Sequence, residues 1–222
     1  MEKLVSAFIF DLDGVITDTA EYHFLAWQAL ANDVNISFTR EDNEELKGIS
    51  RMESLEKILA LGGREDDFSL EEKETLAAKK NEHYLELIQK VSPSDILPGM
   101  KELILTIKAK GHKLGLASAS KNAFTVMEAL DLRDLFDTIV DAKEVKQGKP
   151  HPEVFLTAAE QLGVDPSTCI GVEDAVAGVE AIKAAGMFAV AVGPEESFRH
   201  ADLVYSSTDE VTYERVMAAF QK

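Results

Sequence analysis

Two aspartates, Asp11 and Asp13, directly follow an apolar run near the start of the chain. The run from Val5 to Phe10 is rich in Val, Ile and Phe, which is typical of a buried strand, and Gly14 suits the turn after it. Side chains two residues apart on an extended chain point the same way, so the two carboxylates can share one site. Carboxylates that close repel each other unless a cation lies between them or one holds a proton. The plainer interpretation of this D-x-D-G pattern is a strand end followed by an Asp-Gly turn.

Further polar side chains follow later segments of the chain in the same way. Ser118 ends the strand-like run HKLGLA, and Lys149 lies in the loop sequence GKP. Glu173 and Asp174 come directly after the buried run CIGV. Each has an ordinary alternative, since Ser118 or Asp174 could cap the helix that follows it and Lys149 could be a solvated loop lysine. If they meet at one edge of one sheet, they bring carboxylates, a hydroxyl and an ammonium group together.

These groups suit phosphoryl transfer. Oxygen ligands without His or Cys favour a hard cation, and Mg²⁺ typically binds one or two carboxylates together with phosphate oxygens and water. One carboxylate can attack phosphorus to form an aspartyl phosphate, and a second carboxyl group can act as general acid and base. A hydroxyl group and a lysine can neutralise the charge on the transferred group.

The segments that must position these residues alternate between strand and helix after about residue 100. Strands are predicted at residues 112–117, 138–140, 169–172, 187–192 and 203–205. Helices are predicted at residues 101–110, 151–162, 175–185 and 212–220, and another follows the 112–117 strand and ends at about residue 130. Such alternation implies parallel strands joined by right-handed crossovers. The predicted fold class is α/β, with a doubly wound, mostly parallel, Rossmann-like sheet as its core.

A helical block interrupts this pattern directly after the first strand. Residues 21–89 contain amphipathic helical spacings, notably at 54–61 and 71–88, and lack strand-like runs. A cluster of Ser, Pro, Asp and Gly at residues 92–99 suits a linker. We therefore predict an α/β core formed by residues 1–16 and 96–222, and an inserted helical cap domain formed by residues 17–95.

Composition narrows the class of partner. Forty acidic residues against twenty-three basic ones give a formal charge of -17, which argues against nucleic acid or an anionic membrane surface. Cys169 is the only cysteine, so no intrachain disulfide can form and a reducing compartment is favoured. The apolar N-terminal run is too short for a signal peptide or membrane span. We expect a cytoplasmic protein that is a monomer.

The four motifs together resemble the haloacid dehalogenase-like phosphotransferase superfamily. DLDGVITDT, the serine after a later strand, the lysine of KP and the acidic pair of GVED occur in the order of that superfamily over the whole chain. The resemblance implies that Asp11 is the nucleophile and Asp13 the general acid and base. It assigns Ser118 and Lys149 to the phosphoryl group. The implied ligands of Mg²⁺ are Asp11, the backbone carbonyl of Asp13, Glu173 and Asp174.

The segments TAEYHFLAW, LKGISR and ASASKN resemble the β-phosphoglucomutase family within that superfamily. This resemblance implies a small sugar phosphate as substrate and glucose 1,6-bisphosphate as primer and intermediate. It implies that Thr19 and His23 couple cap closure to the position of the Asp13 carboxyl group. The candidate substrate-binding residues are Gly48, Ile49, Ser50, Arg51, Lys80, Ala119, Ser120, Lys121, Asn122 and Trp27.

Alternatives remain for the cap residues and for the reaction. His23 could be a packed core histidine, Arg51 a surface arginine at a helix start, and Trp27 a core side chain. A hexose-phosphate phosphatase of the same superfamily is the nearest rival function, and a non-catalytic sensor of phosphorylated ligands is a rival of another class. The sequence leaves open the preferred anomer and hexose, the donor that first phosphorylates Asp11, and the pathway.

Overall fold

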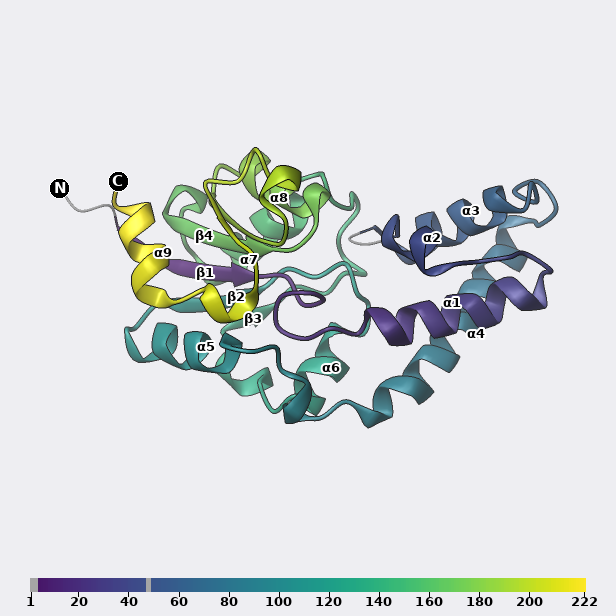
Figure 1. The fold of residues 1–222 in the computed structure, drawn as a ribbon, viewed down its shortest axis with the longest axis horizontal. Coiled ribbons are helices and arrows are strands. Elements are labelled where there is room, and N and C mark those ends of the chain that lie inside the picture. The colour runs from purple at the N-terminus through teal and green to yellow at the C-terminus, as the bar shows by residue number, and fades with distance from the viewer. Residues whose placement is uncertain (1–3, 47–48) are drawn as a thin grey trace. The chain divides into compact units, whose positions relative to one another are not determined.

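The computed structural model describes residues 4–46 and 49–222, and the chain forms two compact units. Unit 1 consists of Met1–Asp18 and Val91–Lys222, and unit 2 consists of Thr19–Lys90. Figure 1 shows a sheet with helices in the first unit and helices alone in the second. Unit 2 is therefore an insertion in the sequence of unit 1, placed directly after the first strand and its loop.

Parallel strands form the centre of unit 1. Within the described residues they build one six-stranded sheet in the order β3-β2-β1-β4-β5-β6, and every pairing is parallel. The strands are β1 (Ala7–Phe10), β2 (Lys113–Leu116), β3 (Thr138–Ile139), β4 (Cys169–Glu173), β5 (Phe188–Val192) and β6 (Leu203–Tyr205). This arrangement confirms the α/β, doubly wound, parallel fold class expected from the sequence.

Helices connect the strands and cover both faces of the sheet. They are α5 (Met100–Ala109), α6 (Ala123–Ala129), α7 (Glu153–Leu162), α8 (Val176–Ala184) and α9 (Tyr213–Phe220). Gly163 ends α7 in the left-handed conformation, with φ 64°, as a glycine C-cap allows. None of the described helices is long and apolar enough to cross a membrane.

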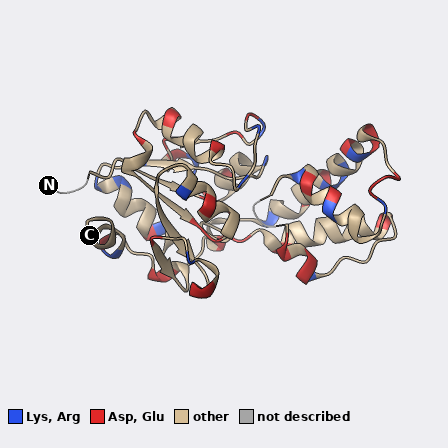
Figure 2. Cartoon of the chain, turned by 90° about the horizontal axis from the view of Figure 1, so that it is seen from above, with Lys and Arg blue, Asp and Glu red and all other residues tan. Residues whose placement is uncertain are grey.

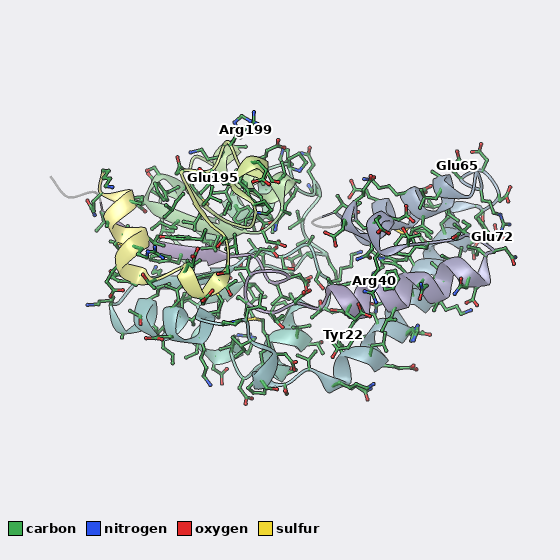
Figure 3. All side chains as sticks on the ribbon, viewed as in Figure 1. Tyr22, Arg40, Glu65, Glu72, Glu195 and Arg199 are labelled. Carbon is green, nitrogen blue, oxygen red and sulfur yellow. The ribbon has the colours of Figure 1, made fainter. Side chains whose placement is uncertain are left out.

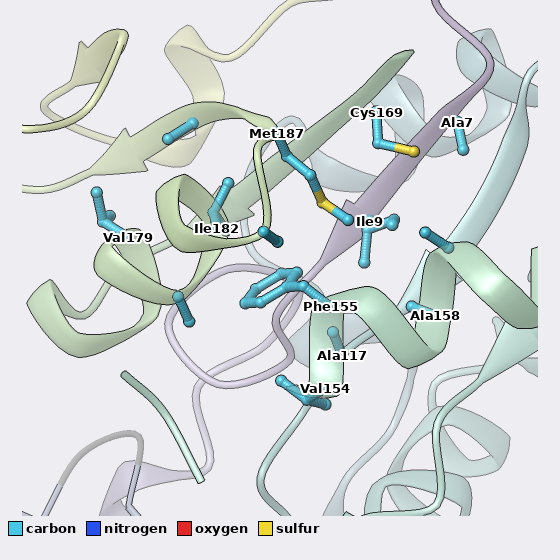
Figure 4. Close-up of a cluster of buried hydrophobic side chains, with 14 of the residues drawn as sticks. Ala7, Ile9, Ala117, Val154, Phe155, Ala158, Cys169, Val179, Ile182 and Met187 are labelled. Atoms are coloured by element: carbon cyan, nitrogen blue, oxygen red, sulfur yellow. The ribbon is translucent and has the colours of Figure 1, made fainter. Parts of the chain in front are cut away.

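The alternation of side chains along β1 fixes how the sheet is packed. Ala7 and Ile9 face a buried cluster with residues of α7 and α8, among them Phe155 and Ile182 (Figure 4). Phe8 points to the opposite face, where its ring centroid lies 6.1 Å from that of Tyr213 in α9. Because both faces are apolar, β1 is buried along its whole length. Its carboxyl end is thereby held in place by packing on two sides.

Unit 2 is a helical unit with its own core. Its helices are α1 (Ala20–Asp33), α2 (Arg40–Glu44), α3 (Arg51–Leu61) and α4 (Leu70–Leu87). Apolar side chains from α1, α3 and α4 and from the connecting segments pack together, including Phe24, Leu55 and Ala77. Capping boxes begin α2, α3 and α4, so the starts of these helices are set by local hydrogen bonds.

The charged side chains are spread over both units, as Figure 2 shows. Glu65 and Glu72 in unit 2 and Glu195 in unit 1 project from the ribbon and are exposed (Figure 3). Charges exposed to solvent are screened by salt, so the surplus of acidic residues has little effect on a buried site. The few charges that line such a site set its electrostatics.

Candidate active site

The carboxyl ends of β1, β2 and β4 meet at one edge of the sheet. Phe10 pairs with Val172 of β4, and the N–H of Asp11 donates to the Val172 carbonyl over 2.9 Å. On the other side, the N–H of Ala117 donates to the Phe10 carbonyl over 2.8 Å. Asp11 therefore leaves the sheet between two neighbouring strand ends. The chain continues from β1 to β2 on one side and places β4 on the other, and ligands bind at such switch points in open α/β sheets.

Lys149 forms an ion pair with Asp11 at this edge. Its Nζ donates to Asp11 Oδ1 over 2.5 Å and lies 3.4 Å from Glu173 Oε2. Lys149 is only 5% exposed, so it is not the solvated loop lysine of the alternative interpretation. Burial alone lowers the pKa of this lysine, but the negative charges of Asp11 and Glu173 outweigh burial and leave the pKa raised. Lys149 is therefore a cation fixed within the site.

Three carboxylates lie close enough together to share a cation. Asp11, Glu173 and Asp174 each offer an oxygen, and these oxygens all lie within 4.8 Å of one another. Burial and the charge of Asp11 raise the pKa of Glu173 well above its ordinary value, against the opposing effect of Lys149. A set of carboxylate oxygens without His or Cys fits Mg²⁺. When bound, Mg²⁺ would neutralise these carboxylates and polarise a phosphate oxygen.

Asp13 lies beyond this cluster, on the loop that follows β1. It is half-buried, and its backbone forms an isolated bridge with that of Thr17. The N–H of Gly14 donates to the Thr17 carbonyl over 2.7 Å, which closes the loop. Among the described residues, the carboxylate cluster consists of Asp11, Glu173 and Asp174 and does not include the side chain of Asp13.

The residues from Ser118 to Asn122 form the loop between β2 and α6. Ser118 Oγ accepts from the N–H of Ser120 over 3.1 Å, and Ser120 Oγ accepts from the N–H of Asn122 over 3.2 Å. Ser118 is buried and does not cap the helix, which begins later at Ala123. Each hydroxyl oxygen thus holds a backbone N–H, which leaves its own proton available to donate. Ala119 is partly buried in this loop and Lys121 is exposed.

Glu153, at the start of α7, shapes the loop that carries Lys149. Its two carboxylate oxygens accept from the N–H groups of Lys146 and Gln147 over 2.8 and 2.9 Å. These hydrogen bonds lower the pKa of the Glu153 carboxyl group. They tie the loop to the start of α7 two residues before Lys149.

A second group of polar residues lies within unit 2. Lys80 Nζ is 2.8 Å from His23 Nδ1 and 4.5 Å from the centre of the Trp27 ring. The ring of Tyr84 stacks on His23 at 4.1 Å, and its hydroxyl donates to Thr19 Oγ1 over 3.1 Å. Burial, followed by the charge of Lys80, lowers the pKa of His23 well below its ordinary value. His23 is therefore neutral near pH 7, with Nδ1 accepting from the Lys80 ammonium group.

Arg51 and its neighbours begin α3 in the same unit. Arg51 Nη2 donates to Asn81 Oδ1 over 2.7 Å and is partly buried, while Ser50 Oγ caps the helix by accepting from the N–H of Glu53. Ile49 is partly buried, and the predicted binding residue Gly48 lies outside the described residues. Arg51 is thus at a helix start, as one alternative held, but its guanidinium group is already oriented by a partner.

Comparisons with known proteins identify the family of this chain. A family model described as haloacid dehalogenase-like hydrolase matches residues 5–186. The chain belongs to the haloacid dehalogenase-like hydrolase family. It is 51% identical to the beta-phosphoglucomutase of Bacillus subtilis over 95% of this chain and 93% of that protein. The crystal structure of a beta-phosphoglucomutase from Clostridium difficile matches with a TM-score of 0.96 and 49% identity, covering 98% of this chain and 97% of that one. Hexitol phosphatase B of Escherichia coli is 31% identical over 95% of this chain and 96% of its own.

In this haloacid dehalogenase-like protein the residues singled out from the sequence fall into two groups. The structure brings Asp11, Lys149, Glu173 and Asp174 together in unit 1, with Ser118 at the same sheet edge. In unit 2 it brings Lys80 of α4 together with His23 and Trp27 of α1. Arg51 contacts α4 at a different residue, Asn81. The sequence analysis missed Tyr84, Asn81 and Glu153. Asn81 and Tyr84 follow Lys80 by one and four residues, and helical spacing could have placed Tyr84 on the face of Lys80.

Proposed function

We propose that this protein is a β-phosphoglucomutase, an Mg²⁺-dependent enzyme that interconverts β-D-glucose 1-phosphate and β-D-glucose 6-phosphate. The observation that carries the proposal is the 51% identity to a protein of that name over nearly the full length of both chains. The site geometry supports it, since a buried aspartate is paired with a lysine beside two further carboxylates.

In the proposed cycle Asp11 carries the phosphoryl group. Phospho-Asp11 donates to the free hydroxyl of the sugar phosphate, giving β-glucose 1,6-bisphosphate, and later receives the other phosphoryl group. Asp13 takes the proton from the attacking hydroxyl and returns it to the leaving oxygen. Ser118 and Lys149 stabilise the charge on the transferred group. Asp11, Glu173, Asp174 and the carbonyl of Asp13 would hold Mg²⁺, and the bisphosphate also serves as primer.

Residues of the inserted unit would bind the phosphate group of the sugar that is not being transferred. Arg51 offers a planar fork for a phosphate, and its bond to Asn81 orients that fork in advance. The candidate residues Gly48, Ile49 and 119–122 would also bind the sugar phosphate, with Trp27 beside Lys80. Exclusion of water by the cap would make the sugar, rather than solvent, the acceptor. We further propose a monomer that acts in the cytoplasm.

A phosphatase that hydrolyses hexose phosphates is the competing function. Proteins named as phosphatases of phosphorylated carbohydrates or hexitols are 33% and 31% identical to this chain. The same aspartate and Mg²⁺ site would serve such an enzyme, with water as the final acceptor. The two functions therefore differ in the fate of the phosphoryl group.

One assay separates them. Enzyme, Mg²⁺, a trace of β-glucose 1,6-bisphosphate and β-glucose 1-phosphate are incubated, and glucose 6-phosphate and inorganic phosphate are measured together, with Asp11→Asn as the control. Isomer formed without matching phosphate release supports the mutase. Release of one phosphate for each substrate consumed would establish the phosphatase instead. Running α-glucose 1-phosphate in parallel determines the anomer.

A further inference from the structure

Gly178 is the third residue of helix α8 and lies in its first turn. Glycine in a helix is less favourable than alanine, by up to about 1 kcal/mol in the helix interior. Gly178 is buried and its φ is not in the left-handed range, so the backbone conformation itself does not require a glycine. Another constraint must account for the absence of a side chain here.

The side chain of Glu173 supplies that constraint. A Cβ atom at Gly178 would lie 1.8 Å from Glu173 Oε1 and 2.1 Å from its Cδ. The carboxylate therefore lies directly on the helix backbone, in the space that any other residue would fill. Glu173 is 1% exposed, and from this place it reaches Lys149 and the cluster with Asp11.

Asp174, the acidic residue after Glu173, also lies in the space that a glycine leaves open. A Cβ atom at Gly14 would lie 2.0 Å from Asp174 Oδ2. The φ of Gly14 is +78°, so a glycine is favoured there by conformation as well. Two carboxylates at the end of β4 thus each lie against a glycine: Glu173 against Gly178 of α8, and Asp174 against Gly14 of the β1 loop.

We propose that Gly178 is a positioning residue for the metal site, which acts by leaving room for the Glu173 carboxylate in its ligating place. An alanine at this position would displace the carboxylate from the other two, while the helix itself would gain stability. The inference rests on the Mg²⁺ site of the proposed function, but it concerns cation binding and does not depend on which phosphoryl reaction follows.

The test is a double-mutant cycle of Gly178→Ala and Glu173→Ala, read out by calorimetric titration with Mg²⁺ alone. Changes that disturb the surroundings of a metal ligand typically weaken binding about 10- to 100-fold, and we expect a rise of that size in the Kd of G178A. In the Glu173→Ala background the same change should leave the Kd unaltered, because nothing remains to displace. Glu180→Ala, on the exposed side of the same helix, is the control and should stay within about twofold of the parent.

Thermal melting without metal gives a second readout, because G178A should change the melting temperature in opposite directions with and without Glu173. G178A should lower the melting temperature when Glu173 is present and raise it when Glu173 is absent. An unchanged Mg²⁺ affinity in G178A would overturn the proposal, since the helix would then have moved instead of the carboxylate. If G178A alone does not fold, a folded double variant supports the clash with Glu173, and a double variant that also fails to fold refutes it. Isomerase activity enters none of these outcomes.

Discussion

Replacing Lys149 by Met removes the cation from a buried group of carboxylates. The Lys149 ammonium nitrogen lies 2.5 Å from Asp11 and 3.4 Å from Glu173, and the lysine side chain is 1% exposed. Methionine has a similar length and fills most of the same volume, so packing against Phe155 is largely kept. The substitution therefore tests charge more than shape.

The expected loss of stability follows from these distances. With an effective dielectric constant of about 20, unit charges at these two separations attract by about 7 and about 5 kcal/mol before desolvation is counted. The cost of burying the ions offsets much of this, and removal of one partner of a buried pair typically costs about 3–5 kcal/mol. For a chain of this length that corresponds to a fall of about 6 to 20 °C in melting temperature.

The measurement is thermal unfolding in EDTA and then in Mg²⁺. Lys143→Met is the matched control, because Lys143 lies exposed in the same loop. In EDTA, K149M should melt well below both the parent and the control. A ligand at 100 times its Kd stabilises a folded protein by about 2.7 kcal/mol, and Mg²⁺ should stabilise K149M at least as much as the parent because the competing ammonium group is gone. If K149M and K143M have the same melting temperature in EDTA, the view that Lys149 balances the charge of the buried carboxylates is refuted.

Three further predictions concern other parts of the molecule. Because the pKa of His23 is lowered in the folded protein, the unfolded chain binds a proton at this histidine at a higher pH than the folded protein does. The free energy of unfolding should therefore fall as the pH drops below 6.5. His23→Gln should lose less stability than the parent between pH 6.5 and 5 in urea unfolding, whereas His200→Gln, at an exposed site, should follow the parent. Tyr84→Phe removes the hydrogen bond to Thr19 and should cost about 0.5–1.5 kcal/mol in the same assay; no change would mean that the bond contributes nothing. Removal of divalent cations should abolish turnover, Mg²⁺ should restore it, and the larger Ca²⁺ should not; activity that persists in EDTA would contradict the metal site.

The fold could be predicted from the sequence because its signals are local. Apolar runs of strand length, each followed by a helical pattern, are enough to imply a parallel sheet. The strands predicted at residues 138–140 and 203–205 correspond to β3 and β6, although both are short. The order of the strands was not predictable, because it depends on which crossovers place β2 and β4 on opposite sides of β1.

Helix boundaries were predicted less well where polar side chains set them. The apolar pattern placed the start of a helix at Ser54, but α3 begins at Arg51 because Ser50 and Glu53 form a capping box. That signal, S-x-x-E, is present in the sequence. The short helix α2 has too few apolar residues to produce a pattern, and it too starts at a capping box.

Burial of the charged residues was the least predictable feature of the site. The pattern around Lys149 is compatible with a solvated lysine, and only the fold shows that residues 138 positions apart, Asp11 and Lys149, form an ion pair. Lys80 is likewise buried on a helix that is otherwise rich in exposed charges. Such contacts arise from long-range packing, which residue types and spacing do not encode.

The most direct test of the central proposal is to identify the residue that carries the phosphoryl group. The enzyme is incubated with Mg²⁺ and β-glucose 1,6-bisphosphate, quenched in acid and reduced with borohydride, which converts an aspartyl phosphate to homoserine, and its peptides are sequenced by mass spectrometry. We predict homoserine at position 11, dependent on the bisphosphate and absent from Asp11→Asn. Modification at another residue, or none in an enzyme that turns over, would contradict the account.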